Sequence, residues 1–346
     1  MKKQSLDLTH DGLEIRTSPK NYPIVLPIPT RPPASSFTML SVATQNHSST
    51  RRTACLSGVL PELFDSSLKP LPGKLIRPCD INFLNYREVP ANSPSWREVA
   101  CIENLRLIWR DGQLNLEFWG FPRDRQLRAT FENLQAGEYL LRFKYCLPSG
   151  TKWKSTALET DFILIRLVEL AEPTSVEVDG IQFEAIAPNQ VVVPFSDNIE
   201  TLTPIEFKLR IQNTSSAPHL FLLHCLIPAL QDKSGQDLDC GYNRNGTYEP
   251  RETDFRLLQP GESLEFIIKG EFYWYKNQLY LRGYENSGGW WHHTIQEGKY
   301  WVSVTYHKRR WKQDPRWCED GAWKLHQEIW EGWVSTPAKK LEVIRA

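Results

Sequence analysis

The residues most able to form a contact surface gather near the C-terminal end of this 346-residue sequence. Nine of its 13 tryptophans lie at position 274 or beyond, and several stand beside arginines. Tryptophan and arginine are enriched at protein-binding hot spots, because they combine a large apolar area with directional polar groups. We therefore predict a protein-binding surface formed by Trp290, Trp291, Arg309, Arg310, Trp311, Arg316, Trp317, Trp323, Trp330 and Trp333.

Three other interpretations of this segment stay open. The tryptophans could pack as a small core beneath a long hairpin, with Lys308–Lys312 as its solvated rim. Arginine with aromatic residues could also bind unpaired bases, although a neutral net charge disfavours nucleic acid. Finally, tryptophans could stack on sugar rings beside carboxylates, which in a glycosidase must lie about 5–10 Å apart. The candidates for that third role are Trp323, Trp330 and Trp333 for stacking, and Glu319, Asp320, Glu328 and Glu331 as carboxylates.

Two stretches carry residue types that could bind a metal ion. Counting Gly246 as position six of a calcium loop places Asn243 at position three and Glu252 at position twelve, as such a loop requires. Position one is then Gly241, which has no side-chain oxygen, so we expect Asp237–Glu252 to form a turn instead. The pair His292-His293 would point to opposite faces of a strand. We therefore predict no metal site.

The sequence contains none of the local motifs that announce common enzyme chemistry. A dinucleotide-binding G-x-G-x-x-G, a phosphate-binding loop, H-E-x-x-H and G-x-S-x-G are all missing. We therefore expect a non-catalytic protein with no cofactor. Its seven cysteines include no C-x-x-C pair, which favours reduced, buried thiols over a disulfide framework.

Composition and charge exclude two classes of partner. Lys+Arg and Asp+Glu both number 41, so no net field draws the protein to nucleic acid or anionic lipid. No apolar run reaches the 18 residues that a membrane span requires, and no apolar h-region follows Lys2-Lys3. We expect a cytoplasmic protein with no membrane partner.

The elements that must position these residues are β-strands. Apolar residues alternate with polar ones over 205–211, 300–306 and 139–145, as in strands with one face on a core. The runs 105–109 and 114–118, joined through Asp111-Gly112, predict a hairpin. No stretch longer than about ten residues carries a helical period. The fold class we predict is all-β, formed from antiparallel sandwiches.

The second half of the chain is a diverged copy of the first. At a shift of 167 residues, positions 45–71 and 212–238 share ten identities in 27, where chance supplies about two. The motif Gln45-Asn46 with Ser48-Ser49 recurs as Gln212-Asn213 with Ser215-Ser216. We interpret that shared motif as a turn that the fold needs. The pattern predicts two tandem domains, residues 1–170 and 171–346.

The two copies differ in length where the tryptophans gather. The first copy uses 15 residues from Tyr145 to Thr160, whereas the second uses 30 from Tyr306 to Thr336. The additional residues lie within 307–333. A loop insertion costs a sandwich little, and loops on rigid scaffolds often carry binding residues. We therefore place the main contact in this insertion, with Trp290-Trp291 adjoining it.

The second copy resembles immunoglobulin-like sandwich domains, including the intracellular proteinase-inhibitor type. Asn213–Ser216 follows one strand, Leu258-Gln259-Pro260-Gly261-Glu262-Ser263 precedes another, and a Gly298-Lys299-Tyr300 strand comes late. The likeness covers most of 176–346, and it reaches 1–170 only through the repeat. It implies two tandem immunoglobulin-like sandwiches, and it suggests proteinase inhibition as a further possible role.

Overall fold

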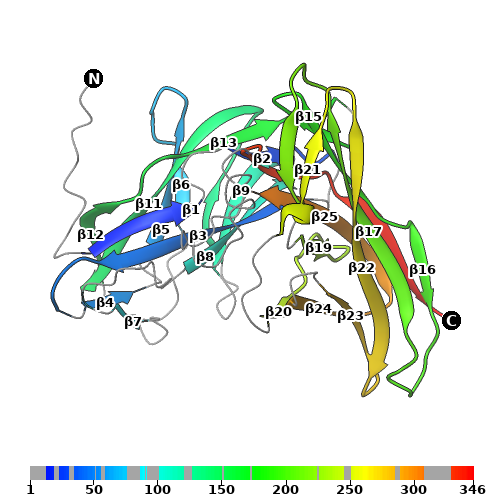
Figure 1. The fold of residues 1–346 in the computed structure, drawn as a ribbon. Helices are drawn as coiled ribbons and strands as arrows, with labels where there is room; N and C mark the ends of the chain where they lie inside the picture. Colours follow the sequence, from blue (N-terminus) through cyan, green and yellow to red (C-terminus); the bar gives the residue numbers. More distant parts are fainter. Residues whose placement is uncertain are drawn as a thin grey trace. The chain divides into compact units, whose positions relative to one another are not determined.

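The structure is a computed structural model that describes most of the chain. The described residues are 13–18, 23–30, 35–50, 52–55, 59–75, 86–89, 91, 101–120, 127–149, 152–171, 174–223, 226–244, 251–284, 289–307 and 329–346. In this part of the chain nearly all regular structure is β-strand, with one 3-10 turn, η3 (Glu252–Asp254). The predicted all-β class is therefore confirmed (Figure 1). No helix among the described residues is long and apolar enough to cross a membrane.

The chain divides into two compact units. Unit 1 comprises Met1–Ile24 and Phe37–Leu167, and unit 2 comprises Val25–Ser36 and Val168–Ala346. The main division thus falls at 167/168, three residues before the boundary drawn from the sequence. The sequence did not indicate that residues 25–36 pack with the second unit.

Unit 1 is composed of antiparallel strands. One sheet has the order β1-β3-β8-β9-β10-β6: β1 (Leu13–Ser18), β3 (Ser35–Asn46), β8 (Cys101–Arg110), β9 (Gln113–Gly120), β10 (Leu127–Phe131) and β6 (Gly73–Leu75). A second group forms on β11, which pairs with three other strands: β11 (Gly137–Ser149), β5 (Val59–Asp65), β12 (Lys152–Glu159) and β13 (Ile163–Val168). A separate pair joins β4 (Arg52–Cys55) to β7 (Tyr86–Val89).

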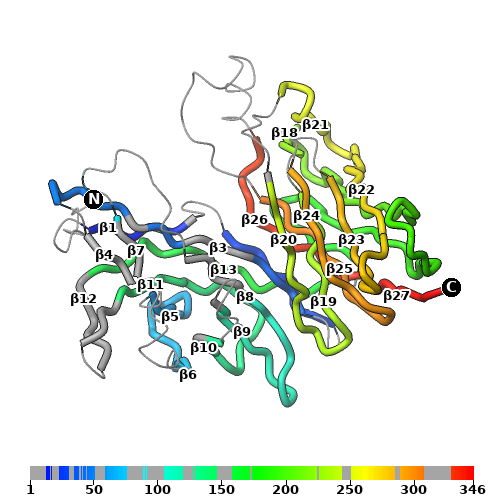
Figure 2. Tube along the Cα trace, turned by 90° about the horizontal axis from the view of Figure 1, so that it is seen from below, coloured from blue at the N-terminus to red at the C-terminus, as the bar shows by residue number. Residues whose placement is uncertain are grey.

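Unit 2 contains a seven-stranded sheet in the order β14-β15-β17-β22-β23-β24-β20. Its neighbouring strands β22, β23, β24 and β20 are labelled in Figure 2. Its strands are β14 (Val176–Val178), β15 (Ile181–Ile186), β17 (Thr203–Asn213), β22 (Ser263–Tyr275), β23 (Gln278–Tyr284), β24 (Gly289–Ile295) and β20 (Cys240–Arg244). A second group forms around β25: β25 (Gly298–His307), β19 (Pro228–Gln231), β26 (Trp333–Ser335), β27 (Lys339–Arg345), β16 (Gln190–Val193) and β2 (Ile24–Pro27). A short pair joins β18 (His219–Leu222) to β21 (Phe255–Leu258).

The alternating sequence pattern decides which face of each strand is buried. Along β17, Ile205, Phe207, Leu209 and Ile211 are all buried, whereas the residues between them reach the surface. The predicted hairpin is also present, because β8 and β9 pair directly around Asp111-Gly112. Both turn residues have positive φ, 49° and 76°, as a two-residue hairpin turn with the matching twist requires.

Several local structures occur twice, once in each unit. The buried amide of Asn46 donates to the carbonyls of Thr50 (2.8 Å) and Val89 (3.1 Å). The buried amide of Asn213 donates to those of Ala217 (2.8 Å) and Leu258 (3.1 Å). Both asparagines also accept from the serine two residues on. The prediction that this motif forms a structural turn is confirmed.

The same correspondence extends to a tyrosine at the start of β11 and of β25. The Tyr139 hydroxyl accepts from the Gln135 N–H and donates to the Gln135 carbonyl, both at 3.0 Å. The Tyr300 hydroxyl does the same with Gln296, at 3.0 and 2.7 Å. The strand order β1-β3-β8-β9-β10-β6 in unit 1 also matches β15-β17-β22-β23-β24-β20 in unit 2.

The N-terminal segment of unit 2 is held by both polar and apolar contacts. Val25 is fully buried and belongs to the apolar core of this unit. The Ile28 N–H donates to the Val168 carbonyl at 2.8 Å. The buried amide of Gln231 donates to Ser35 Oγ at 2.5 Å. These contacts explain why 25–36 clusters with a unit that otherwise begins at Val168.

Candidate binding face of the second unit

The structure describes four of the ten predicted contact residues, all tryptophans of unit 2. Arg309, Arg310, Trp311, Arg316, Trp317 and Trp323 lie outside the described residues, as do the carboxylates Glu319, Asp320 and Glu328. The fourth candidate carboxylate, Glu331, is exposed. The four described tryptophans are Trp290, Trp291, Trp330 and Trp333.

Trp330 is part of the core of unit 2. Its side chain is 7% exposed, and its ring lies 5.2 Å from Phe183, 6.0 Å from Phe221 and 5.8 Å from Tyr306 between centroids. The backbone N–H of Trp330 donates to the Leu220 carbonyl at 2.7 Å. This environment is the one that the packing interpretation predicts for the residue.

Trp333 and Trp291 are also buried. Trp333 stacks on His307 with centroids 4.5 Å apart and an angle of 21° between the planes. Trp291 points into the unit, and a side chain at Gly283 would place its Cβ 2.2 Å from the indole. The sequence around these tryptophans is thus adapted to packing their large rings.

Trp290 lies on the opposite face of β24, because neighbouring residues of a strand point to opposite sides. Its ring stacks on His292 with centroids 5.4 Å apart and planes 28° apart. Gly241 of β20 is paired with His292, and a Cβ there would lie 2.1 Å from the imidazole. Glycine at position 241 therefore leaves the space that the His292 ring occupies.

Trp290 and His292 belong to a larger aromatic face on the same side of the sheet. Strands β22 and β23 place Tyr273 opposite Tyr280, and β23 and β24 place Tyr284 opposite Trp290. We define the aromatic face by its seven members: Tyr273, Tyr275, Tyr280, Arg282, Tyr284, Trp290 and His292. None of them is buried, and Tyr284 and Tyr275 are 60% and 45% exposed.

Ring and cation contacts connect five members of the aromatic face into a ladder, which comprises Tyr273, Tyr275, Tyr280, Arg282 and Tyr284. Tyr273 and Tyr280 are stacked, with centroids 5.4 Å apart and planes 20° apart. The Arg282 guanidinium lies over Tyr273 at 4.6 Å and over Tyr284 at 5.7 Å. Lys276 lies over Tyr275 at 5.1 Å. Cations over aromatic faces are attracted to the ring quadrupole, so the ladder is stabilised before any ligand binds.

The charges on this face are held in fixed positions. The Arg282 Nε donates to Glu271 Oε1 at 2.7 Å. Burial disfavours the charged form of Arg282, but this hydrogen bond and the negative charge of Glu271 outweigh it, so the pKa of Arg282 lies above its ordinary value. Burial also raises the pKa of Tyr273. At neutral pH the face thus presents the Arg282 cation beside the neutral phenol of Tyr273.

Most of the corresponding positions in unit 1 are not aromatic, although Tyr284 corresponds to Trp119. At a shift of 165 residues, Tyr273, Tyr280 and Arg282 correspond to Ile108, Asn115 and Glu117. Ile108 pairs with Asn115 as Tyr273 pairs with Tyr280. All three side chains in unit 1 are buried. The half-buried tyrosine pair Tyr273–Tyr280 is therefore a property of unit 2.

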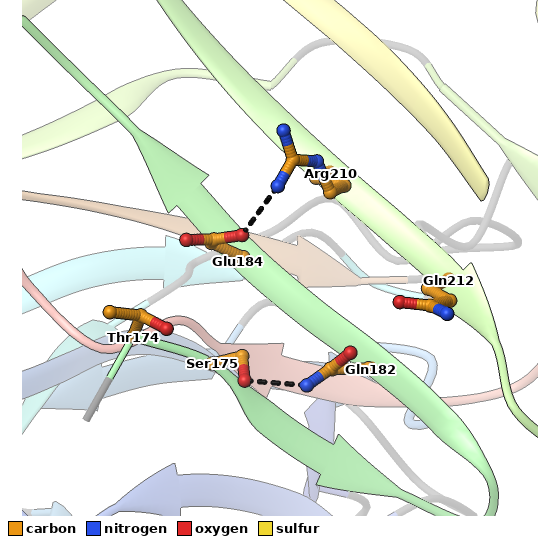
Figure 3. Close-up of a pocket in the computed structure, with 6 residues that line it drawn as sticks. All are labelled: Thr174, Ser175, Gln182, Glu184, Arg210 and Gln212. Carbon is orange, nitrogen blue, oxygen red and sulfur yellow. Dashed lines mark hydrogen bonds and ion pairs between the residues drawn. The ribbon is translucent and has the colours of Figure 1, made fainter. Parts of the chain in front are cut away.

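A shallow polar hollow lies on the same side of the seven-stranded sheet, at β14, β15 and β17. It has a volume of about 200 Å³ and is lined by Thr174, Ser175, Gln182, Glu184, Arg210 and Gln212. Figure 3 shows Arg210 directed at Glu184, at 3.0 Å, and Gln182 directed at Ser175, at 2.7 Å. Arg210 also bonds Glu265, and Glu184 bonds Lys339. These ion pairs hold the lining side chains in place.

The possible metal ligands are used in the fold. His293 is buried, and its Nδ1 lies 3.0 Å from the Asp239 carbonyl. Burial lowers the pKa of His293 to about 4, so the ring is neutral at physiological pH. Residues Cys240–Arg244 form strand β20 where we expected a turn, and 245–250 lie outside the described residues. Within the described part of the chain, no group of three His, Cys, Asp or Glu residues is placed to bind a metal.

The tyrosines of the aromatic face were not predicted from the sequence, because the tryptophans are concentrated further along the chain. The signal was present as alternation, Tyr273 and Tyr275 before the turn and Tyr280 and Tyr284 after it. Alternating aromatics that do not continue the core pattern indicate an outward face. No protein-family model and no curated protein matches this chain.

Proposed function

We propose that this protein is a non-catalytic module that binds a protein partner through its second unit. The observation that carries the proposal is the exposed aromatic face on β22, β23 and β24. Tyrosine, tryptophan and arginine are the residues most enriched at the centres of protein interfaces. The stacked rings are already ordered, which lowers the entropy lost when a partner immobilises them.

The Trp/Arg-rich insertion remains part of this proposed contact. Arg309, Arg310, Trp311, Arg316, Trp317 and Trp323 keep the role that the sequence predicts for them. Trp291, Trp330 and Trp333 support the surface from within, because their side chains are buried. Trp290 belongs both to the contact residues predicted from the sequence and to the aromatic face. We also propose that the protein is cytoplasmic, because the spacing of its seven cysteines favours reduced thiols over disulfide bonds.

The scaffold we propose is two immunoglobulin-like sandwiches in tandem, produced by duplication. The matching strand orders and the paired asparagine turns support a common ancestor for residues 1–170 and 171–346. Tyr139 and Tyr300 support the immunoglobulin-like assignment, because a tyrosine bonded to the backbone a few residues upstream marks that class of sandwich.

Recovery of a partner from lysate of the source organism tests the proposal. We would compare the full chain with Tyr275→Ser/Tyr284→Ser, with a variant whose 308–328 segment is a Gly/Ser loop, and with Leu257→Ser as control. Leu257 is 56% exposed in the same unit but on the β18–β21 pair. We expect one discrete protein to be recovered by the full chain and the control, and lost from the double tyrosine variant. Equal recovery by all four proteins would contradict the proposal.

A carbohydrate is a second candidate ligand, supported by the polar hollow on the same side of the sheet as the aromatic face. Sugars need both an aromatic ring for their C–H face and polar side chains for their hydroxyls, and both lie on one side of the sheet. An oligosaccharide array would test this alternative. Binding that is lost in both Tyr284→Ser and Gln212→Ala would favour it over a protein partner.

A further inference from the structure

Strand β16 ends its sheet and leaves one edge without a neighbouring strand among the described residues. It pairs with β27 in parallel, with Val191 opposite Val343. Figure 1 shows β16 at the margin of unit 2, beside the C-terminal strand β27. An open edge presents backbone donors and acceptors to another strand, and natural proteins usually protect such edges.

The backbone groups available on this edge can be identified from the hydrogen bonds to β27. The carbonyls of Asn189 and Val193 accept from Glu342 and Ala346, at 2.9 and 3.2 Å. Backbone groups alternate in direction along a parallel ladder, so Val191 also faces β27. The N–H and C=O groups of Gln190 and Val192 therefore point away from the sheet.

The side chains around this edge are apolar and exposed. Val192 is 51% exposed, and Phe195, Ile199 and Leu202, which follow it in the chain, are also exposed. Phe195 is fixed by its contact with Trp274, at 5.0 Å between centroids, and by Arg345 at 4.3 Å over its ring. The edge thus combines unpaired backbone groups with apolar side chains that a second strand could cover.

We propose that β16 pairs with β16 of a second copy of this chain, which makes the protein a symmetric dimer with a continuous sheet. A two-fold axis requires the two strands to run antiparallel, and only the residue on the axis then faces its own copy. With the axis at Val191, Gln190 faces Val192 of the other copy, and both exchange N–H···O=C bonds.

The charge pattern of the segment favours a second copy as the occupant. Residues 185–196 contain no charged side chain, in a chain in which 24% of residues are charged. A two-fold interface places like charges together, and like charges opposite each other are destabilising in sheets. The nearest charged residues on β27, Glu342 and Arg345, have opposite signs. Residues 185–196 therefore place no charged side chain against their own copy.

Sedimentation equilibrium of the full chain over a wide concentration range tests the dimer. Val192→Pro removes an outward N–H without touching a bond to β27, whereas Val192→Thr keeps that N–H and nearly the same shape. We expect Val192→Pro to raise the dimer dissociation constant at least about tenfold, because the two-fold axis doubles each loss. The Thr variant should stay within about twofold.

A second substitution tests the dimer independently, in case the proline variant does not fold. Val192→Lys keeps the N–H but places two ammonium groups near the axis, so it should weaken the dimer most at low salt. A chain that stays monomeric at every concentration would overturn the proposal. So would a dimer whose dissociation constant is unchanged in both Val192→Pro and Val192→Lys. Circular dichroism melting curves would show whether each variant folds.

Discussion

At the scale of single residues, burial decides which of the notable side chains can meet a partner. Trp291, Trp330 and Trp333 are as large and amphipathic as Trp290, yet only Trp290 lies on the outward face. Composition cannot separate these cases, because tryptophan is common both in cores and at interfaces. Glycines near two of the buried tryptophans were a signal in the sequence that these rings are packed inside. Gly283 and Gly332 stand where a Cβ would meet the rings of Trp291 and Trp330.

His293 makes the stability of unit 2 sensitive to acid. Its pKa is about 4 in the folded protein and 6.5 in an unfolded chain. Above pH 6.5 both states are neutral and stability is unaffected. As pH falls from 6.5 towards 4 the unfolded chain takes up a proton that the folded protein excludes, so folding loses up to about 3 kcal/mol.

Urea unfolding at pH 7 and at pH 4.5 would measure this loss. We expect His293→Gln to be less stable at pH 7 but to lose less stability on acidification than the natural chain. His47→Gln is the control, since His47 is exposed at the surface. If His293→Gln and the natural chain lose the same free energy between the two pH values, another group is responsible.

At the scale of elements, the strands were the most predictable part of the molecule. Period-two alternation identified β17, β25 and the β8–β9 hairpin, because one buried face fixes the side on which apolar residues must lie. Strand β20 was mistaken for a turn. Its sequence, Cys-Gly-Tyr-Asn-Arg, lacks alternation, and it becomes a strand through its pairing with β24. Pairing with a neighbour can override weak local preference.

The asparagine turns give a prediction at this scale. Asn213→Ala would leave the carbonyls of Ala217 and Leu258 without their amide donor in a buried site. Lost hydrogen bonds of this kind cost about 1–3 kcal/mol each, so we expect a loss of about 3 kcal/mol in the free energy of unfolding. Ser215→Ala removes the hydroxyl contacts to Asn213, Ala217 and His219, which lie at the exposed side of the turn, and it should cost less, about 1 kcal/mol. Urea unfolding would measure both losses. Equal losses of unfolding free energy in the two variants would show that the unpaired carbonyls of Ala217 and Leu258 cost little.

At the scale of the whole molecule, the sequence indicates two domains but not the exchange of a segment between them. A boundary drawn from a repeat assumes that each copy is continuous along the chain. The strand Ile24–Pro27 is buried throughout, and such a pattern requires a covered strand without saying which sheet covers it. Only the three-dimensional contacts assign 25–36 to unit 2.

This assignment predicts an effect far away in the sequence. Val25 is buried in the core of unit 2, so Val25→Ala should destabilise that unit by about 2 kcal/mol. Local stability is read out by amide hydrogen exchange, and we expect faster exchange in β17 and β22 with β8 and β9 unchanged. Ile15→Ala, in the core of unit 1, should do the reverse. The two substitutions lie ten residues apart, so opposite exchange patterns could arise only if the chain passes from one core to the other between them. Faster exchange in β8 and β9 for both variants would instead place Val25 with the first core.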